Sequence, residues 1–310
     1  MKLTIGTRGS NLAIAQTQEV VNALMKICPE TDVEIKKIKT TGDKIQDTTL
    51  HDIGGKALFV KELEMALKEG EIDLAVHSMK DVPGEIHGDF EIFPVLARAN
   101  PKDVLIAKNN HNLDTLPLAS TVATSSLRRK AQLLAYRKDL NIVPIRGNIN
   151  TRIEKFRNSQ EIEAIVLAKA GIDRLALDVD ITQILTTEVI VPCVGQGALG
   201  IEILKENQDL MEKLKVLQDE NVEKCVAAER AFLQRLGGSC YVPVGAYAEL
   251  IEASELSITG VVAGLDGQEV LKDTERGPLN APSELGKNIA EKLLAEGADR
   301  ILKEIEQEVE

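Results

Sequence analysis

The sequence predicts an α/β protein with two successive α/β regions and a smaller α+β region at its C-terminal end. The chain has 310 residues, which is more than one ordinary hydrophobic core accommodates. Over about the first two hundred residues, strand-like runs alternate with amphipathic helices, which is typical of a mostly parallel sheet covered on both faces. The remaining residues place consecutive strands between helices, as an antiparallel α+β domain does.

The first region begins with a strand over residues 2–7 and a helix over residues 10–27, for which Ser10 or Asn11 can serve as the N-cap. A strand over residues 33–40 follows. A helix over residues 55–70 then ends at Gly70, and its exit leads to a buried strand over residues 72–79.

The second region repeats this alternation. Strands are predicted at 103–108, 120–126, 141–147 and 163–171, with helices at 126–137 and 148–158, and Ser125 or Ser126 can cap the first of these helices. The run 187–204 contains Gly195-Gln196-Gly197, which reads as a turn. The last region has a helix at 221–236, strands at 241–250, 256–267 and 268–276 with a turn at Asp266-Gly267, and a closing helix or helix pair from 283.

Composition limits the classes of function. The net charge of −12 disfavours nucleic acid as a partner, as does an aromatic content of 3% without tryptophan. The sequence has no signal-peptide pattern and no apolar run long enough for a membrane helix, so we expect a cytoplasmic protein with reduced thiols. The spacing of the four cysteines and four histidines predicts no metal site. Cys28, Cys193 and Cys225 are expected to be buried and inert.

Cations follow nearly every predicted strand of the first two regions, although the chain as a whole is acidic. Ligands of open α/β sheets bind beyond the carboxyl ends of the strands, so these cations are expected to gather at one site. Arg128 and Arg129 are notable because they lie in the first turn of a helix, where the helix dipole disfavours cations. Arginine binds carboxylates through two parallel hydrogen bonds, and no phosphate-binding glycine loop is present. We therefore predict a ligand with several carboxylates, held by cations at Arg8, Lys80, Arg128, Arg129, Arg146, Arg152, Lys169 and Arg174.

Asp81 is the one acid among these strand-end cations. It is either the ion-pair partner of Lys80 or a group that stabilises positive charge or moves a proton in a reaction. His77, inside a buried strand, is expected to be a hydrogen-bonded core residue.

Several short runs are specific in combination, above all "HSMKDVP", "TSSLRR" and "IRGNINTR". With the other matching runs, which extend in order from about residue 5 to residue 300, they make the sequence resemble the porphobilinogen deaminase (hydroxymethylbilane synthase) family. The resemblance implies two α/β domains similar to type II periplasmic binding proteins and a C-terminal α+β domain with a small antiparallel sheet. It implies domain 1 at residues 1–96 plus 194–213, domain 2 at 97–193 and domain 3 at 214–310.

The resemblance also implies a transferase that joins four porphobilinogen molecules head to tail into hydroxymethylbilane, releases four ammonia molecules and serves tetrapyrrole and haem biosynthesis. A dipyrromethane cofactor would be attached to Cys240 through a thioether, and Asp81 would be the catalytic residue. The matching positions imply a cofactor site formed by Cys240, Ser10, Lys80, Asp81, Ser126, Arg128, Arg129 and Arg146. They imply a substrate site formed by Arg8, Ser10, Lys56, Phe59, Ser125, Arg146, Arg152 and Arg174. No metal, nucleic acid or membrane is implied, and a monomer is expected.

Two positions depart from the family pattern: Ser239 separates Gly238 from Cys240, and Asp52 stands where the family often has lysine. Two other classes of protein stay open. A two-domain polycarboxylate-binding protein fits the predicted fold and cations, but does not account for Asp81, Cys240 and the third domain. A cysteine-nucleophile enzyme would need a histidine near Cys240, and every histidine precedes residue 112.

Overall fold

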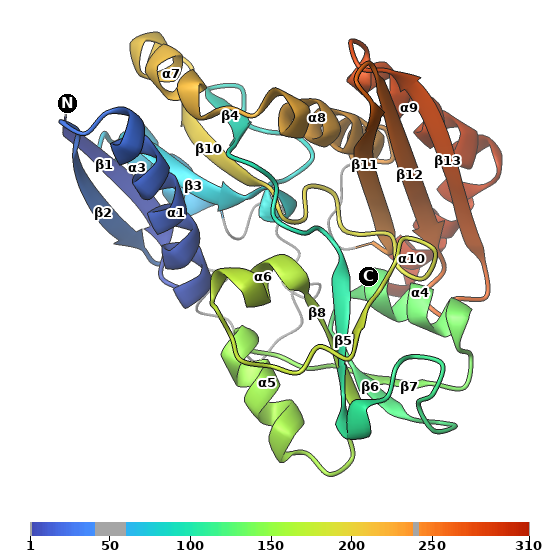
Figure 1. The fold of residues 1–310 in the computed structure, drawn as a ribbon. Helices are drawn as coiled ribbons and strands as arrows, with labels where there is room; N and C mark the ends of the chain where they lie inside the picture. The colour runs from blue at the N-terminus through green and yellow to red at the C-terminus, as the bar shows by residue number, and fades with distance from the viewer. Residues whose placement is uncertain (1, 41–59, 238–241, 310) are drawn as a thin grey trace.

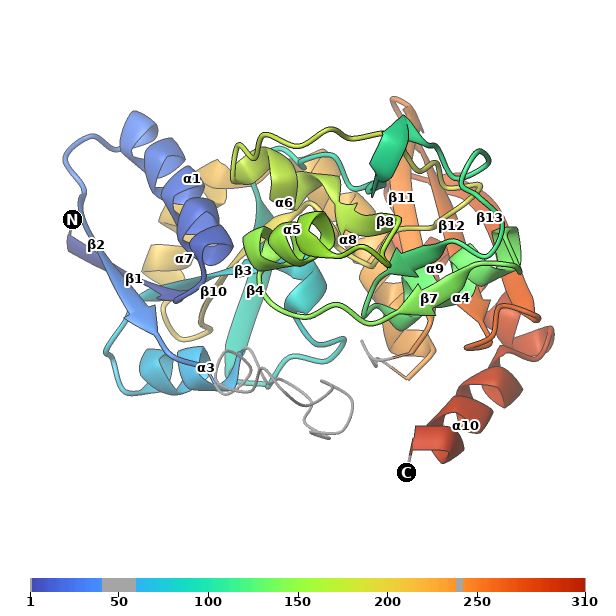
Figure 2. The same cartoon turned by 90° about the horizontal axis from the view of Figure 1, so that it is seen from below.

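A computed structural model describes residues 2–40, 60–237 and 242–309. Its elements form two α/β units, named here lobe 1 and lobe 2, and a third unit named domain 3 (Figure 1). Lobe 1 contains the blue and cyan elements of Figure 1 and the yellow to gold segment 199–217, lobe 2 the green elements and domain 3 the brown and red ones. In the view from below, the N-terminus lies at the lobe 1 end and the C-terminus at the domain 3 end (Figure 2).

Lobe 1 is built on a five-stranded sheet in the order β2-β1-β3-β10-β4. β1 (Lys2–Arg8) pairs in parallel with β2 (Asp32–Ile38) and β3 (Leu74–Ser78). β10 (Leu199–Leu204) is antiparallel to both β3 and β4 (Phe90–Val95). The run that follows lobe 2 in the sequence therefore returns to complete the first sheet.

The helices of lobe 1 bury apolar faces against this sheet. α1 (Asn11–Ile27) is capped by Ser10, whose Oγ accepts a hydrogen bond from Ala13 N at 3.2 Å. α3 (Lys61–Lys68) ends just before Gly70. Gly70 has a φ of +67°, a left-handed conformation that glycine adopts without steric cost. α7 (Gln208–Leu214) and the turn Lys215–Leu217 pack into the same core as β1 and β3.

Lobe 2 has a sheet of the same arrangement, in the order β7-β6-β8-β5-β9. Its strands are β5 (Asp103–Ala107), β6 (Thr121–Ala123), β7 (Asn141–Val143), β8 (Ala164–Ala168) and β9 (Gln183–Ile184). Its helices are α4 (Leu127–Tyr136), α5 (Ile149–Asn158) and the short α6 (Lys169–Arg174), a helix where a continued strand was predicted.

The prediction of a mostly parallel sheet is wrong for both lobes. In each sheet two neighbouring strand pairs are parallel and two are antiparallel. The antiparallel pairs arise because β10 and β5 run against their neighbours β3 and β8. The amino ends of β10 and β5 therefore lie at the same sheet edges as the carboxyl ends of the parallel strands.

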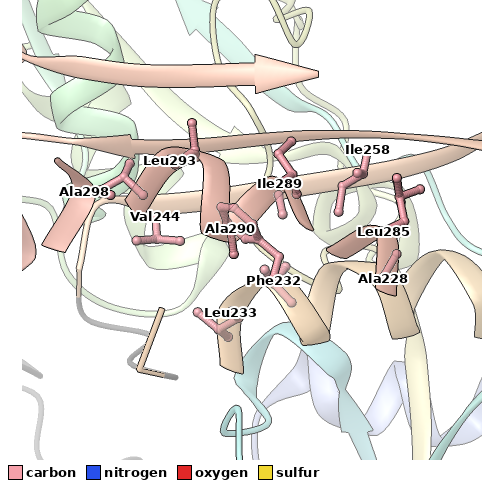
Figure 3. Packing of buried hydrophobic residues seen from close by; sticks show 14 of the residues in the cluster. Ala228, Phe232, Leu233, Val244, Ile258, Leu285, Ile289, Ala290, Leu293 and Ala298 are labelled. Carbon is pink, nitrogen blue, oxygen red and sulfur yellow. The ribbon is translucent and has the colours of Figure 1, made fainter. Parts of the chain in front are cut away.

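Domain 3 packs helices on a three-stranded antiparallel sheet, in the order β11-β12-β13. The strands are β11 (Val244–Glu252), β12 (Glu255–Ala263) and β13 (Val270–Pro278). α8 (Glu220–Arg235) precedes them, and α9 (Pro282–Ala295) and α10 (Ala298–Val309) form the closing helix pair. Figure 3 shows Phe232 of α8 beside Ile289 and Ala290 of α9, all within one buried cluster.

The domain boundaries of the sequence analysis stay a prediction. The lobe 1 core continues to Leu217, beyond residue 213, so we propose that domain 3 begins after this residue. Domain 3 also contacts both lobes. Gly267, in the turn between β12 and β13, lies so close to the backbone of α4 that a Cβ there would clash with Ala131 O.

Candidate functional site

The predicted site residues that the structure describes lie at or near the strand ends of the two lobes. Lys80 and Asp81 form a single turn, Met79–Asp81, directly after β3. The segment before β10 passes against this turn, because a Cβ on Gly195 would lie only 2.7 Å from Met79 Cβ. Gly195 has a φ of +68°, so glycine both takes the required conformation and allows the contact.

Arg8 and Asp81 form an ion pair within lobe 1. The distance from Arg8 Nη1 to Asp81 Oδ2 is 3.5 Å, and both side chains are partly exposed. Among the described residues, Asp81 thus forms its ion pair with Arg8 and not with Lys80, the partner that the sequence suggested. A pocket is lined by both residues together with Ser10, Gln16 and other residues of β1, α1 and β3. The Nε2 of Gln16 donates to Ser78 Oγ at 2.6 Å, which fixes one wall of this pocket.

Three cations of the site, Lys80, Arg146 and Arg152, form no ion pair with a carboxylate of the described residues. Burial lowers the pKa of Lys80, and nearby Arg129 lowers it further although Asp81 opposes the change. Burial, together with the like charges of Arg129 and Arg146, lowers the pKa of Arg152 to about 10. We call Lys80, Arg129, Arg146 and Arg152 the basic cluster. Its residues come from both lobes and repel one another.

Arg128 and Arg129 lie in the first turn of α4 and are almost fully buried. Both pair with Asp103, at 2.8 Å from Arg128 Nη1 to Oδ2 and 2.7 Å from Arg129 Nη2 to Oδ1. The two guanidinium groups also donate to backbone carbonyls, at 2.7 Å to Val191 O and 3.0 Å to Val166 O. Arg129 Nε is buried and has no hydrogen-bond partner among the described residues.

The predicted serine ligands have structural partners. Ser126 caps α4 by accepting from Arg129 N, at 3.4 Å. Ser125 Oγ donates to Ile145 O at 2.7 Å and accepts from Ile145 N at 3.0 Å, and Ile145 immediately precedes Arg146. Ser125 thus holds the segment that carries Arg146 against the start of α4.

Arg174 connects the two lobes. Its Nε lies 2.9 Å from Glu19 Oε2 on α1, and its Nη2 donates to Gly197 O at 3.0 Å. Its side chain is 8% exposed, so a ligand reaches Arg174 only if it replaces or joins these partners. Lys169, the other strand-end cation of this segment, pairs with Asp173 at 2.7 Å.

Lys56, Phe59 and Cys240 lie outside the described residues, as do the departures at Asp52 and Ser239. His77 is buried and its Nε2 lies 2.8 Å from Glu202 Oε2, which confirms a hydrogen-bonded core histidine. Cys225 is buried, and burial raises its pKa to about 11. Cys28 and Cys193 are only partly buried as whole residues, so the prediction of a buried thiol is wrong for Cys28, whereas burial raises the pKa of the Cys193 thiol. Within the described ranges, no helix has the length and apolarity to span a membrane, and no group of His, Cys, Asp and Glu could hold a metal ion.

Domain 3 is fixed to the site through α8. Glu229 is fully buried and accepts hydrogen bonds from Gly195 N at 2.7 Å, Ala248 N at 2.8 Å and Arg98 Nη1 at 2.6 Å. The next residue, Arg230, donates from Nη2 to Pro83 O at 2.8 Å. The helix that leads toward residue 240 is therefore held against the segment that leaves Asp81.

Sequence reasoning missed the polar residues that support the basic cluster. These are Asp103, Gln132, Gln196, Arg98 and Glu229. Asp103 escaped notice because only residues after strands were considered, whereas Asp103 begins β5. β5 is antiparallel to β8, and Asp103 pairs with Ala168 at the end of that strand. An acid directly before a buried strand was the available signal.

The fold defines a class: a two-lobed α/β protein of the type II periplasmic-binding-protein type with an added antiparallel α+β domain. Its similarity to individual solved structures is remote. The methionine-binding protein MetQ gives a TM-score of 0.43 at 15% identity, over 74% of this chain and 94% of that one. CbnR, a LysR family transcriptional regulator, gives 0.44 at 14% identity over 70% of each chain. Scores this low carry no argument about function.

The chain belongs to the porphobilinogen deaminase family. Residues 3–212 match the family model described as "Porphobilinogen deaminase, dipyromethane cofactor binding domain", and residues 223–295 match the C-terminal domain of the same family. Porphobilinogen deaminase of Natranaerobius thermophilus is 52% identical over 99% of this chain and 100% of the relative. That of Shouchella clausii is 45% identical, over 100% of this chain and 99% of the relative. The resemblance inferred from the sequence is confirmed.

Proposed function

We propose that this chain is a porphobilinogen deaminase, a transferase that joins four porphobilinogen molecules head to tail into hydroxymethylbilane and releases four ammonia molecules. This activity would serve tetrapyrrole and haem biosynthesis. The observation that carries the proposal is the 52% identity to a porphobilinogen deaminase over the full length of both chains. The basic cluster supports it independently, because a chain of net charge −12 keeps these cations at one site at an electrostatic cost.

The described residues fit a dipyrromethane cofactor. Such a group carries an acetate and a propionate on each ring, so it brings four carboxylates. Lys80, Arg146 and Arg152 have no carboxylate partner among the described residues, and Arg129 Nε is buried without a hydrogen-bond partner. Ligand carboxylates would pair with these groups and relieve the repulsion that depresses the pKa of Arg152.

The proposed roles follow the contacts. The cofactor would be held by three cations of the basic cluster, Lys80, Arg129 and Arg146. Residues at the start of α1 (Ser10) and of α4 (Ser126 and Arg128) would support them, and Cys240 would be the covalent anchor. When bound, the dipyrromethane supplies the free pyrrole α-carbon to which the first substrate ring is joined. Arg8 and Arg152, on opposite lobes, would bind substrate carboxylates. Lys56, Phe59, Ser125 and Arg174 complete the proposed substrate site, and Arg174 would first have to exchange Glu19 for a ligand.

Asp81 is the proposed catalytic residue. Its carboxylate lies at the pocket of Arg8 and Ser10, where it would accept a hydrogen bond from a pyrrole N–H of the bound ligand. Loss of ammonia leaves positive charge on the substrate ring, and a fixed carboxylate next to that ring stabilises the charge as it develops. Arg8, as its ion-pair partner, would orient the Asp81 carboxylate. We also propose that the protein acts as a cytoplasmic monomer without nucleic acid, in agreement with its acidic charge.

Intact mass and turnover test the proposal together. The purified protein should exceed its sequence mass by two linked pyrrole units located on Cys240, and Cys240→Ser protein should have the sequence mass and no activity. Asp81→Asn should keep the added mass and the melting temperature but lose most turnover. An unmodified mass with an alkylatable Cys240 would instead favour a polycarboxylate-binding protein, and a fully active Asp81→Asn enzyme would remove Asp81 from the mechanism.

A further inference from the structure

Asp103 lies at the centre of the contacts that hold the arginines of lobe 2. It is the first residue of β5 and is fully buried. Its Oδ1 accepts hydrogen bonds from Arg129 Nη2 at 2.7 Å and Gln196 Nε2 at 2.8 Å, and its Oδ2 pairs with Arg128 Nη1 at 2.8 Å. No other carboxylate of the described residues pairs with either arginine.

The electrostatics of this group are unusual for a protein interior. Burial alone would raise the pKa of Asp103, but the two adjacent guanidinium groups hold it well below its usual range. Asp103 is therefore ionised at neutral pH. Two buried arginines share this single carboxylate, so the group of three keeps one net positive charge.

That remaining charge belongs to the basic cluster. The charge of Arg129 lowers the pKa of both Arg152 and Lys80, and Asp103 in turn acts on Lys80 in the opposite sense. Arg129 thus faces Lys80 of lobe 1 and Arg152 of lobe 2 at one place. Because the planes of Arg128 and Arg129 are fixed by Asp103 and by backbone carbonyls, their remaining N–H groups point in fixed directions.

The segment before β10 completes the arrangement. Gln196 is almost fully buried, and its Nε2 donates both to Asp103 and to Pro101 O, at 2.6 Å. Gln132 of α4 accepts from Val191 N at 2.8 Å, so the same segment is also fixed to the helix that carries the arginines. Asp103 is thereby connected to the segment before β10, which contacts the turn of Lys80 and Asp81.

We propose that Asp103 is a positioning residue for anion binding: it orients Arg128 and Arg129 and cancels one of their two charges, so that lobe 2 presents a preoriented arginine pair to an acidic ligand. This inference rests on the proposed function only for the identity of that ligand. Preorientation lowers the ordering cost of binding, because the arginine side chains need not be fixed when the ligand arrives.

A pair of variants separates positioning from simple structural support. Asp103→Asn removes the charge, and Asp103→Glu keeps the charge but moves the carboxylate by one methylene group. The matched control is Glu202→Gln, which removes another fully buried carboxylate, the partner of His77, from lobe 1 without touching the arginines. Each variant is made in the full chain and, in parallel, in a Cys240→Ser background.

The first measurement is the upward shift of melting temperature that mellitate, a benzene hexacarboxylate, causes in the Cys240→Ser proteins. Without an Asp103 change, this probe should stabilise the protein by binding the basic cluster. Asp103→Glu should melt within about 5 °C of its parent yet lose most of the mellitate shift. Glu202→Gln should melt lower than its parent and keep the shift.

The second measurement, on the chains with Cys240, is the added mass and the kinetics with porphobilinogen. Asp103→Glu should raise KM by about tenfold or more, as expected when an oriented charge pair is disturbed. If Asp103→Glu keeps the parental mellitate shift, added mass and KM, the inference is overturned, even if Asp103→Asn fails to fold. A parental protein that mellitate does not stabilise overturns it too. If the parental chain makes no product but mellitate binding depends on Asp103, the proposed function fails and this inference stands.

Discussion

Removing the carboxylate of Glu229 should strongly destabilise the protein, although this residue lies outside the basic cluster. Glu229 is fully buried and joins Arg98, the backbone N–H of Gly195 and that of Ala248. Glu229→Ala would leave Arg98, whose side chain is 10% exposed, as an uncompensated buried charge. Breaking a buried ion pair on one side costs about 3–5 kcal/mol. Two backbone donors would also lose their acceptor, so this range is a lower estimate.

The expected change in melting temperature follows from the size of the chain. An unfolding entropy of about 2.1 cal/mol/K per residue gives about 0.65 kcal/mol/K for 310 residues. A loss of 3–5 kcal/mol then corresponds to a decrease of about 5–8 °C. Thermal unfolding followed by circular dichroism measures it. The control is Glu291→Ala, which breaks the exposed ion pair with Arg235 in the same domain and should cost under about 1 kcal/mol.

A double-mutant cycle of Arg98→Gln and Glu229→Gln should give a coupling free energy of at least about 1 kcal/mol. Two results would refute the claim that Glu229 stabilises the contact between lobe 1, lobe 2 and domain 3. The first is a Glu229→Ala protein that melts within about 2 °C of the parent, and the second is one that melts no lower than Glu291→Ala.

Three further predictions concern the basic cluster and the segment before β10. Arg152→Gln should raise the free energy of unfolding of the Cys240→Ser protein by about 1–2 kcal/mol in chemical denaturation. The reason is that burying the Arg152 charge among like charges destabilises the fold by more than the hydrogen bond from Arg152 Nε to Gly147 O stabilises it. In the chain with Cys240 the same change should raise KM. The melting-temperature shift that mellitate causes in the Cys240→Ser protein, which lacks the cofactor, should fall as pH rises through about 10, where Arg152 loses its proton. The pH profile of the shift should be flatter for Arg152→Gln in the same background, and parallel profiles would exclude Arg152 as the titrating group. Gly197→Ala should lower stability by about 1–3 kcal/mol, because Gly197 has a φ of +88° and its Cβ would clash with Ala99 O, whereas Gly9→Ala meets no neighbour and should be neutral.

Local sequence patterns determined most elements and their ends. Ser10 and Ser126 cap their helices, Gly70 ends α3, and Asp266-Gly267 forms a turn. These features depend on short-range hydrogen bonds and on backbone conformations that a few residue types allow, so the chain encodes them locally. The cations that follow the strands were likewise visible, because a helix start or strand end is recognisable without knowing its neighbours.

Tertiary structure alone decided how these cations are used. Whether a strand runs parallel or antiparallel depends on distant partners, so the sequence did not reveal that Asp103 lies at the same sheet edge as Arg129, or Gln196 at the same sheet edge as Lys80. The same applies to Glu19 and Arg174, which are far apart in the chain and meet only because α1 and α6 are neighbours. The sequence by itself predicted that cations gather at the strand ends for an acidic ligand. Only the packing of the two lobes and domain 3 decided which cations are compensated by protein carboxylates and which have no such partner among the described residues, because pairing requires contact in space.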